Sequence, residues 1–385
     1  MVNIATCSIA LGIVVMVMSV CILQGFQSEF ERKISGFGSH ITVSHFELNN
    51  DYSDTPINID HPCVAEILKV KGVTHLQPTS SKGGMIKTEE EIHGIVFKGV
   101  DMHYDTTFFK SNLEYGRLFR LNDSTPSNEI IISSTISKKT GIDTGDKVRT
   151  YFWQGNNYRA RAFNVVGIYN TDLTEFDEHY MIGDLRQVQR LNNWSHNEAS
   201  CWEILVDDFD QINAIADAVV SQLPFTLNAT TVIEQNMGLF SWLNLLNSNI
   251  TLIIIIMSLV CAIAIISALL IMIFEKTSTI GILKTLGATN RSIAKIFLIR
   301  SAQIIVKGIA WGDTIALVLC LLQKHLHIVK LDEASYSMDF VPIEMSIATF
   351  IIISIGALAI CMLALLLPAS YISKIRPAET IKIEQ

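Results

Sequence analysis

The chain contains 385 residues, of which 49% are hydrophobic and 17% are charged, and its formal net charge is −8. The apolar residues are concentrated in long blocks rather than scattered, which excludes a single soluble globule and indicates a membrane protein with one soluble domain. The acidic balance, without a Lys/Arg stripe interleaved with aromatic residues, excludes a nucleic-acid-binding protein.

Four windows of the sequence meet the requirement of about 20 mostly apolar residues for a membrane-spanning helix. We therefore place spans at residues 1–24, 250–274, 296–322 and 345–368. The first window lacks the basic region and the small-residue cleavage site of a signal peptide, so we interpret it as a span. We also expect a basic cytoplasmic lead-in to be missing from this start site.

The distribution of basic residues predicts the orientation of these spans. The segment 275–295 carries Lys276, Lys284, Arg291 and Lys295 against one acidic residue, and the tail 369–385 also places Lys and Arg beside a span. Because short cytoplasmic loops are enriched in these residues, we place both segments and both termini in the cytoplasm. Residues 25–249 then form a large domain outside the cytoplasm, and the loop 323–344 lies outside as well.

The third span is interrupted by Arg300, Gln303, Lys307 and Asp313. Ionisable residues inside a membrane often mark a substrate or proton pathway. In the alternative interpretation, Arg300 extends to the cytoplasmic interface, Lys307 faces a neighbouring helix and Asp313 lies near the far end of the span. The sequence leaves both interpretations open.

Short runs rich in β-branched and aromatic residues alternate with brief helical patterns in the outer segment, which predicts an α+β domain. We expect strands at 41–43, 94–100, 129–132, 147–152, 162–169 and 202–206, and helices at 64–70, 184–191 and 208–223. Thr231 and Glu234 form a capping box ahead of an apolar stripe that runs into the second span. This pattern predicts one rigid stalk helix.

Motifs of known chemistry are missing from the sequence, which contains neither a phosphate-binding loop nor a zinc-protease or hydrolase signature. We therefore expect no catalytic residue, no metal site and no cofactor bound by this chain. The acidic residues Asp172, Glu175, Asp177 and Glu178 lack the glycine and spacing of a calcium loop, and we interpret them as a solvated loop. Cys63 and Cys201 either form a disulfide outside the cytoplasm or remain free thiols.

The cytoplasmic segment between the second and third spans predicts a short amphipathic helix. Ile280, Leu283 and Leu286 recur every three residues, Lys284 points elsewhere, and Gly287 suits the left-handed position that ends a helix. An exposed apolar ridge of this kind requires a partner groove or a lipid surface.

Residues 280–288 resemble the coupling helix of ABC permeases of the FtsX/MacB superfamily, although many members carry Glu where Thr279 stands. Residues 373–380 are similar to the terminal motif of that superfamily. Residues 25–41 and 166–177 resemble the lipoprotein-releasing permeases of the Lol system. The resemblance implies a membrane protein of four transmembrane α-helices, with a MacB-like periplasmic core domain between spans 1 and 2 and an FtsX-like permease domain at 250–385.

The same resemblance implies functional residues of three kinds. Coupling to the ATPase is assigned to Ile280, Gly281, Ile282, Leu283, Lys284, Leu286 and Gly287. A lipid gate between the first two spans is assigned to Val15, Ser19, Ile254 and Ser258. Contact with a carrier is assigned to Trp153, Gln154 and Tyr158. The hairpin 153–160 is shorter than the carrier-docking loop that one of the two Lol permease types uses.

The partners implied by the resemblance are a cytoplasmic ATPase pair that uses ATP and Mg²⁺, a second permease chain of the same or a sister type, a lipoprotein substrate and a periplasmic lipoprotein carrier, all at the inner membrane. Two alternatives belong to the same superfamily: a MacB-type export permease, and a non-transporting regulator of a periplasmic hydrolase, whose outer domain is much smaller. An intramembrane enzyme is disfavoured, because only Lys307 and Asp313 are available at membrane depth.

Overall fold

The computed structural model describes residues 2–46, 55–88, 92–122, 125–154, 157–331 and 338–366. It divides into two compact units. The helical unit comprises Met1–Ser28, Ser241–Lys330 and Phe340–Gln385, and the αβ unit comprises Glu29–Phe240 and Leu331–Asp339. The terminal motif at 373–380 and the basic residues of the tail lie outside the described residues.

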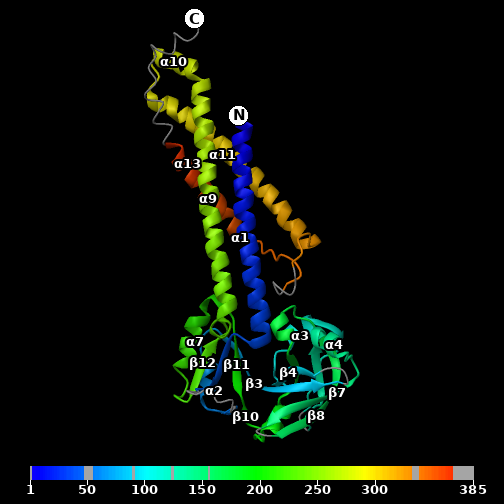
Figure 1. Ribbon diagram of the computed structural model, residues 1–385. Coiled ribbons are helices and arrows are strands. Elements are labelled where there is room, and N and C mark those ends of the chain that lie inside the picture. Colours follow the sequence, from blue (N-terminus) through cyan, green and yellow to red (C-terminus); the bar gives the residue numbers. More distant parts are fainter. Residues whose placement is uncertain are drawn as a thin grey trace. The chain divides into compact units, whose positions relative to one another are not determined.

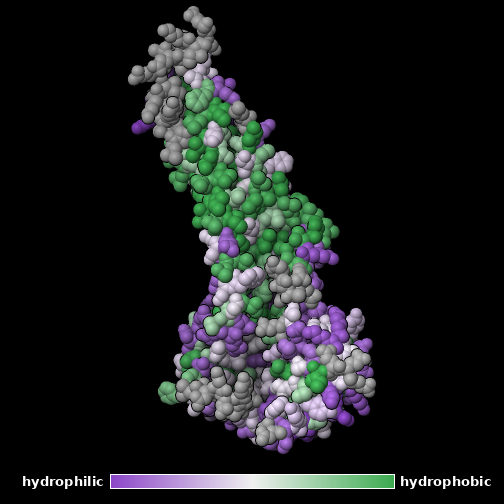
Figure 2. Space-filling model, viewed as in Figure 1, coloured by the Kyte–Doolittle hydropathy of each residue, from purple (hydrophilic) through white to green (hydrophobic). Residues whose placement is uncertain are grey.

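Among the described residues, four helices are long and apolar enough to cross a membrane (Figure 1). They are α1 (Val2–Gly38), α9 (Met237–Glu275), α11 (Asn290–Leu326) and α13 (Ile347–Ala364). The four predicted spans are thus confirmed as helices. A hydropathy window detects only the apolar part of a helix. The helices α1, α9 and α11 therefore extend beyond the spans predicted for them from the sequence. Figure 2 shows the apolar surface of this unit in green.

Close packing around α1 organises the helical unit. A Cβ atom added to Gly12 of α1 would lie 2.4 Å from Cys261 Sγ of α9. On α11, a Cβ atom at Gly308 would lie 2.9 Å from Ile9 Cβ, and one at Gly312 would lie 2.7 Å from Ile13 Cβ. Small residues at such positions let membrane helices approach closely, so α1 is packed between α9 and α11.

Ten of the described strands of the αβ unit form one sheet in the order β12-β1-β11-β3-β4-β9-β6-β8-β5, with β7 paired to both β3 and β8 (Figure 1). The strands β2 and β10 pair with each other in a separate two-stranded sheet. Because β7 joins β3 to β8, the strands β3, β4, β9, β6, β8 and β7 close into a barrel. The pairs β4/β9 and β6/β8 are parallel. Phe97, Phe152, Phe163 and Met181 are fully buried in its core. Outside the barrel, β11, β1 and β12 extend the sheet from β3 as an antiparallel layer, and β5 pairs antiparallel with β8.

The elements of the αβ unit have the following bounds. The strands are β1 (Ile41–His45), β2 (Ile57–Asn58), β3 (Val73–Lys87), β4 (Ile92–Val100), β5 (Leu113–Gly116), β6 (Glu129–Ser133), β7 (Lys147–Gln154), β8 (Asn157–Tyr169), β9 (Tyr180–Asp184), β10 (Glu198–Ala199), β11 (Cys201–Val206) and β12 (Leu227–Thr231). The helices are α2 (Cys63–Ile67), α3 (Thr107–Ser111), α4 (Ser134–Thr140), α5 (Thr174–Asp177), α6 (Leu185–Asn192), the 3₁₀ helix η1 (Phe209–Gln211), α7 (Ile212–Val220) and α8 (Val232–Gln235).

The six predicted strands all occur. The helix predicted at 184–191 is present as α6, whereas the other two predicted helices are shorter in the structure, with α2 ending at Ile67 and α7 at Val220. The long strand β3 was not predicted, because Pro78, Gly83 and Gly84 interrupt its pattern of alternating residues. Pairing with β11, β4 and β7 holds β3 extended despite these residues.

The stalk was predicted as one continuous helix, but the structure interrupts it at Asn236. The capping box of Thr231 and Glu234 is present, but it caps the four-residue α8. Asn236 then leaves helical geometry, with φ −117° and ψ 42°. The following helix α9 begins at Met237 and runs through the second span to Glu275, as the apolar stripe predicts.

Candidate functional site: the segment between α9 and α11

The predicted amphipathic helix is present as α10 (Thr277–Thr285), between α9 and α11 in the helical unit. Gly287 adopts φ +91°, the left-handed conformation expected at a helix end. Thr289 then caps α11, its Oγ1 accepting a hydrogen bond from the backbone N–H of Ser292 at 3.3 Å. Two local sequence signals therefore bound this segment: Gly287 at the end of α10 and Thr289 at the start of α11.

The apolar side chains of α10 divide between two faces. Ile280 is 1% exposed and Leu283 packs partly buried against the apolar core of the helical unit. Ile282 is 56% exposed and Leu286 is 79% exposed. Steps of three residues rotate by roughly 60° around a helix, whereas Ile282 and Leu286, four residues apart, lie on one face. The predicted ridge of Ile280, Leu283 and Leu286 is therefore split, and the exposed apolar face is formed by Ile282 and Leu286.

The remaining predicted coupling residues lie around this face. Gly281 is buried, Lys284 is half-buried and Thr279 is exposed. Sequence spacing alone did not single out Ile282, since it stands between the residues of the three-residue repeat.

The predicted gate residues lie on α1 and α9, and Ser258 contacts α1 directly. Val15 and Ser19 on α1 are half-buried, as are Ile254 and Ser258 on α9. Ser258 Oγ lies 3.7 Å from Met16 Sδ, and Ile254 packs against the apolar core. The structure thus brings the α9 pair to α1, along a seam that is closed by the contact of Gly12 with Cys261.

The polar residues of the third span differ in what they contact. Arg300 donates a hydrogen bond to Gln303 Oε1 at 3.2 Å, and Lys307 is exposed on the surface of the helical unit rather than facing one of its described helices. Asp313 accepts a hydrogen bond from Ser354 Oγ of α13 at 2.8 Å. Asp313 therefore links α11 to α13, within this chain.

The predicted carrier-contact residues lie at the β7–β8 hairpin, whose tip at 155–156 is outside the described residues. Gln154 pairs with Asn157 in the register, so the strands remain joined up to the tip. Trp153 and Tyr158 are 56% and 53% exposed, and their rings make an edge-to-face contact at 4.7 Å between centroids. Such a pair presents rigid apolar area to solvent, which suits a protein-binding surface.

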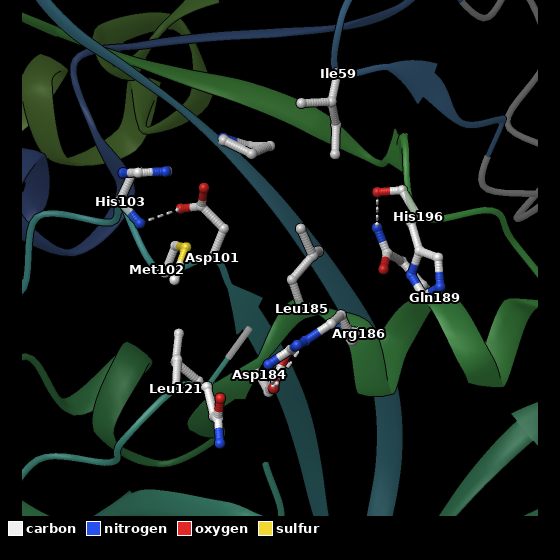
Figure 3. Close-up of a pocket in the computed structure, with 12 residues that line it drawn as sticks. Ile59, Asp101, Met102, His103, Leu121, Asp184, Leu185, Arg186, Gln189 and His196 are labelled. Carbon is white, nitrogen blue, oxygen red and sulfur yellow. Dashed lines mark hydrogen bonds and ion pairs between the residues drawn. The ribbon is translucent and has the colours of Figure 1, made fainter. Parts of the chain in front are cut away.

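The αβ unit contains a cavity of about 260 Å³ beside the N-terminus of α6 (Figure 3). Its buried acid, Asp184, is paired with Arg186 at 2.7 Å and also accepts a hydrogen bond from the backbone N–H of Ser127. Gln189 donates to the carbonyl oxygens of His196 and Glu198. These polar groups hold loops together, and we assign the cavity no ligand.

Cys63 and Cys201 are free thiols, and burial raises the pKa of Cys201 to about 12, which keeps it protonated and unreactive. Within the described part of the chain, no group of three or more His, Cys, Asp or Glu residues could hold a metal ion. The solvated-loop interpretation was wrong for Asp177, which is 2% exposed and accepts two hydrogen bonds from Thr171, each 2.9 Å long.

The buried Asp177 and the half-buried His40 of the αβ unit make opposite contributions to its stability as the pH changes. Burial raises the pKa of Asp177 from 3.8 to about 6, so the folded state binds more protons and loses stability as pH rises from 3.8 to 6. Burial lowers the pKa of His40 from 6.5 to about 4, so the folded state binds fewer protons and gains stability as pH rises from 4 to 6.5. The two contributions offset each other in the native chain.

Replacing either group should expose the contribution of the other. We expect Asp177→Asn to give an αβ unit whose stability rises with pH between 4 and 6.5, and His40→Asn to give the reverse slope, each on the order of 1–3 kcal/mol. Unfolding of the full chain in detergent, followed by tryptophan fluorescence across this pH range, measures both slopes. Parallel profiles for the two variants would contradict the assignment.

The four apolar helices, the separate αβ unit and the short helix α10 between the second and third spans define a multi-span membrane protein with one large domain outside its spans. Residues 4–222 match the MacB-like periplasmic core domain, and residues 251–377 match the FtsX-like permease C-terminal domain. The chain therefore belongs to the family of permeases that carry a MacB-like periplasmic core domain.

Relatives of known name extend over nearly the whole chain. The lipoprotein-releasing system transmembrane protein LolC of Xylella fastidiosa is 21% identical, covering 98% of this chain and 92% of that protein. The corresponding LolE of Haemophilus influenzae is 22% identical, covering 97% of this chain and 92% of that protein. The macrolide export ATP-binding/permease protein MacB of Neisseria gonorrhoeae is 24% identical, covering 97% of this chain and 57% of that protein.

Proposed function

We propose that this chain is the transmembrane permease subunit of an ABC transporter that couples ATP hydrolysis by a separate ATPase to release of lipoproteins from the inner membrane toward the outer membrane. The observation that carries the proposal is similarity over at least 97% of the chain to two lipoprotein-releasing relatives, each matched over 92% of its own length. The exposed apolar face of α10 supports it, because such a face suits a groove on a partner protein.

In this mechanism Ile282 and Leu286 dock into the ATPase, which binds ATP and Mg²⁺. Ile280 and Leu283 join α10 to the apolar core of the helical unit, so a displacement of α10 is passed to the membrane helices. The seam between α1 and α9, closed at Gly12 and Cys261, separates to admit the acyl chains of the lipoprotein. A second permease chain, the same or a sister, completes the transporter.

The chain is accordingly placed in the inner membrane with both termini in the cytoplasm and the αβ unit in the periplasm. This orientation rests on the basic segment 275–295 and on the periplasmic character of the matched domain. Labelling a cysteine introduced at exposed Thr279 from each side of spheroplast membranes tests it, and reaction from the periplasmic side would contradict it.

The exposed Trp153 and Tyr158 pair is the proposed contact for a periplasmic lipoprotein carrier. Because truncating an aromatic anchor at an interface costs about 2 kcal/mol or more, Trp153→Ala with Tyr158→Ala should lower carrier affinity by roughly 30-fold or more. Titration of release against carrier concentration measures the shift. Phe225→Ala is the matched control, since Phe225 is a fully exposed aromatic residue elsewhere in the αβ unit. An unchanged titration would remove the hairpin from the carrier site.

The proposed function is tested by ATP-dependent release of a labelled lipoprotein from proteoliposomes that contain this chain, its co-purified partners and a soluble carrier. Release that requires both ATP and carrier is the expected result. ATP hydrolysis without release, in a preparation that contains the intact complex, would contradict lipoprotein release. That result would favour an export permease, the function named in the MacB relative, or a mechanical regulator of the same superfamily.

A further inference from the structure

The last turns of α1, within the αβ unit, are enclosed by aromatic side chains. Phe37 is 1% exposed, and its ring centroid lies 4.6 Å from that of Phe176 and 4.8 Å from that of Tyr180. A Cβ atom at Gly36 would lie 2.3 Å from the ring of Phe108. The rings of Phe108, Phe176 and Tyr180 therefore pack closely against the end of α1.

A buried lysine holds the end of this helix. The last carbonyl groups of a helix have no partner within the helix, and a cation near them is favourable. Lys98 of β4, 3% exposed, donates a hydrogen bond from Nζ to the carbonyl oxygen of Phe37 at 2.6 Å. The same Nζ lies 2.8 Å from Glu203 Oε1 of β11. One ammonium group thus connects α1 with two strands of the sheet.

Glu203 is itself held in position by neighbouring side chains. It is 5% exposed and accepts hydrogen bonds from Thr79 Oγ1 at 3.0 Å and Gln77 Nε2 at 3.3 Å. Burial lowers the pKa of Lys98, but the charge of Glu203, together with Tyr104, raises it by more, so the pKa is raised overall and the ammonium stays charged. A buried ion pair adds little net stability compared with a well-packed apolar pair, so its effect here is to specify the position of α1.

A second ion pair holds α1 through its own side chain. Lys33 is 4% exposed, and its Nζ lies 3.0 Å from Asp172 Oδ2 in the turn after β8. The helix is therefore tied to two parts of the αβ unit, through its terminal carbonyl and through Lys33.

The connection to α9 is built differently. It passes through Asn236, which is not helical, and a Cβ atom at the nearby Gly238 would meet nothing within 4 Å. A cavity of about 490 Å³ in the αβ unit is lined by Phe37 and Gly38 at the end of α1, by Lys98 and Glu203, and by Asn236. The end of α1 and the junction of α8 with α9 thus border the same open space, and the Lys98–Glu203 pair lies beside it.

We propose that the Lys98–Glu203 pair is a positioning device that fixes the end of α1 within the αβ unit. This inference rests on the proposed function for its consequence in transport. Lys98 and Glu203 act through α1 and contact no substrate.

The test uses the full chain with its co-purified ATPase and compares the native protein with the double variant Lys98→Met, Glu203→Met, which leaves no unpaired buried charge. We expect hydrogen exchange at the amides of 34–39 to rise by about tenfold or more, the factor that loss of a charge-assisted hydrogen bond predicts. ATP hydrolysis should stay within about twofold while lipoprotein released per ATP falls by about tenfold, because positioning affects coupling rather than the ATPase itself.

The control is Lys139→Met with Glu178→Met, an ion pair of the same 2.8 Å length whose side chains are 43% and 37% exposed; it should change neither readout. Unchanged exchange at 34–39 in the Lys98 and Glu203 variant would overturn the anchoring role. Faster exchange with unchanged release per ATP would overturn the role in coupling. If the native complex releases no lipoprotein, the proposed function fails, and hydrogen exchange still decides whether the pair anchors α1.

Discussion

Replacing Ile282 and Leu286 together by aspartate is expected to abolish ATP-driven release while leaving the chain folded. Both side chains are mostly exposed, so the substitutions remove little packing within the chain. Burying two such side chains against a partner contributes about 3 to 6 kcal/mol, and losing that contribution weakens association more than a hundredfold. Co-purification of the ATPase and release of lipoprotein from proteoliposomes measure the two consequences.

Variants on the opposite face of α10 should behave differently. Ile280→Asp places a carboxylate in the core of the helical unit, and Leu283→Asp does so in part, so both should lower the melting temperature of the chain. Phe225→Asp, which also replaces an exposed apolar residue by a charged one, should affect neither stability nor coupling. If the Ile282 and Leu286 variant still co-purifies with its ATPase and releases lipoprotein at the native rate, α10 is not the coupling element.

Leucine at Gly312 is expected to destabilise the helical unit by about 1–3 kcal/mol, the range typical of overpacking. A Cβ atom at this position already lies 2.7 Å from Ile13 Cβ and 2.9 Å from the carbonyl oxygen of Ala10, so the larger side chain must push α1 away from α11. The same substitution at Gly308 meets Ile9 and the backbone of Thr6. Thermal unfolding in detergent, followed by monodispersity on size-exclusion chromatography, measures the loss.

Gly356→Leu is the matched control for both glycines. Gly356 lies in a membrane helix, α13, but a Cβ atom there would meet nothing within 4 Å. All three variants gain the same intrinsic helix propensity, so a difference between them reports packing alone. Equal melting temperatures for Gly312→Leu and Gly356→Leu would show that α1 and α11 are not in close contact.

Much of the architecture was determined by the sequence through short-range patterns. The four spans, the six predicted strands and α10 follow from hydropathy and periodicity within windows of 5 to 25 residues, because helices and strands each repeat over such lengths. Gly287 and Thr231 were likewise correctly interpreted as a helix end and a helix cap, since both signals depend on the local backbone. Each of these elements is therefore indicated by the residues that form it.

Only the tertiary structure decided which side chains meet and which remain exposed. Ile280 and Leu286 are six residues apart, so their side chains point in directions that differ by roughly 120° around the axis of α10. Packing against the membrane helices therefore buries Ile280 and leaves Leu286 exposed. The strand β3 is held by partners on both sides rather than by its own propensity. Lys98, Glu203 and the carbonyl of Phe37 belong to distant parts of the chain. No local pattern indicates that the fold brings Lys98 Nζ within 3 Å of both Glu203 and the carbonyl oxygen of Phe37.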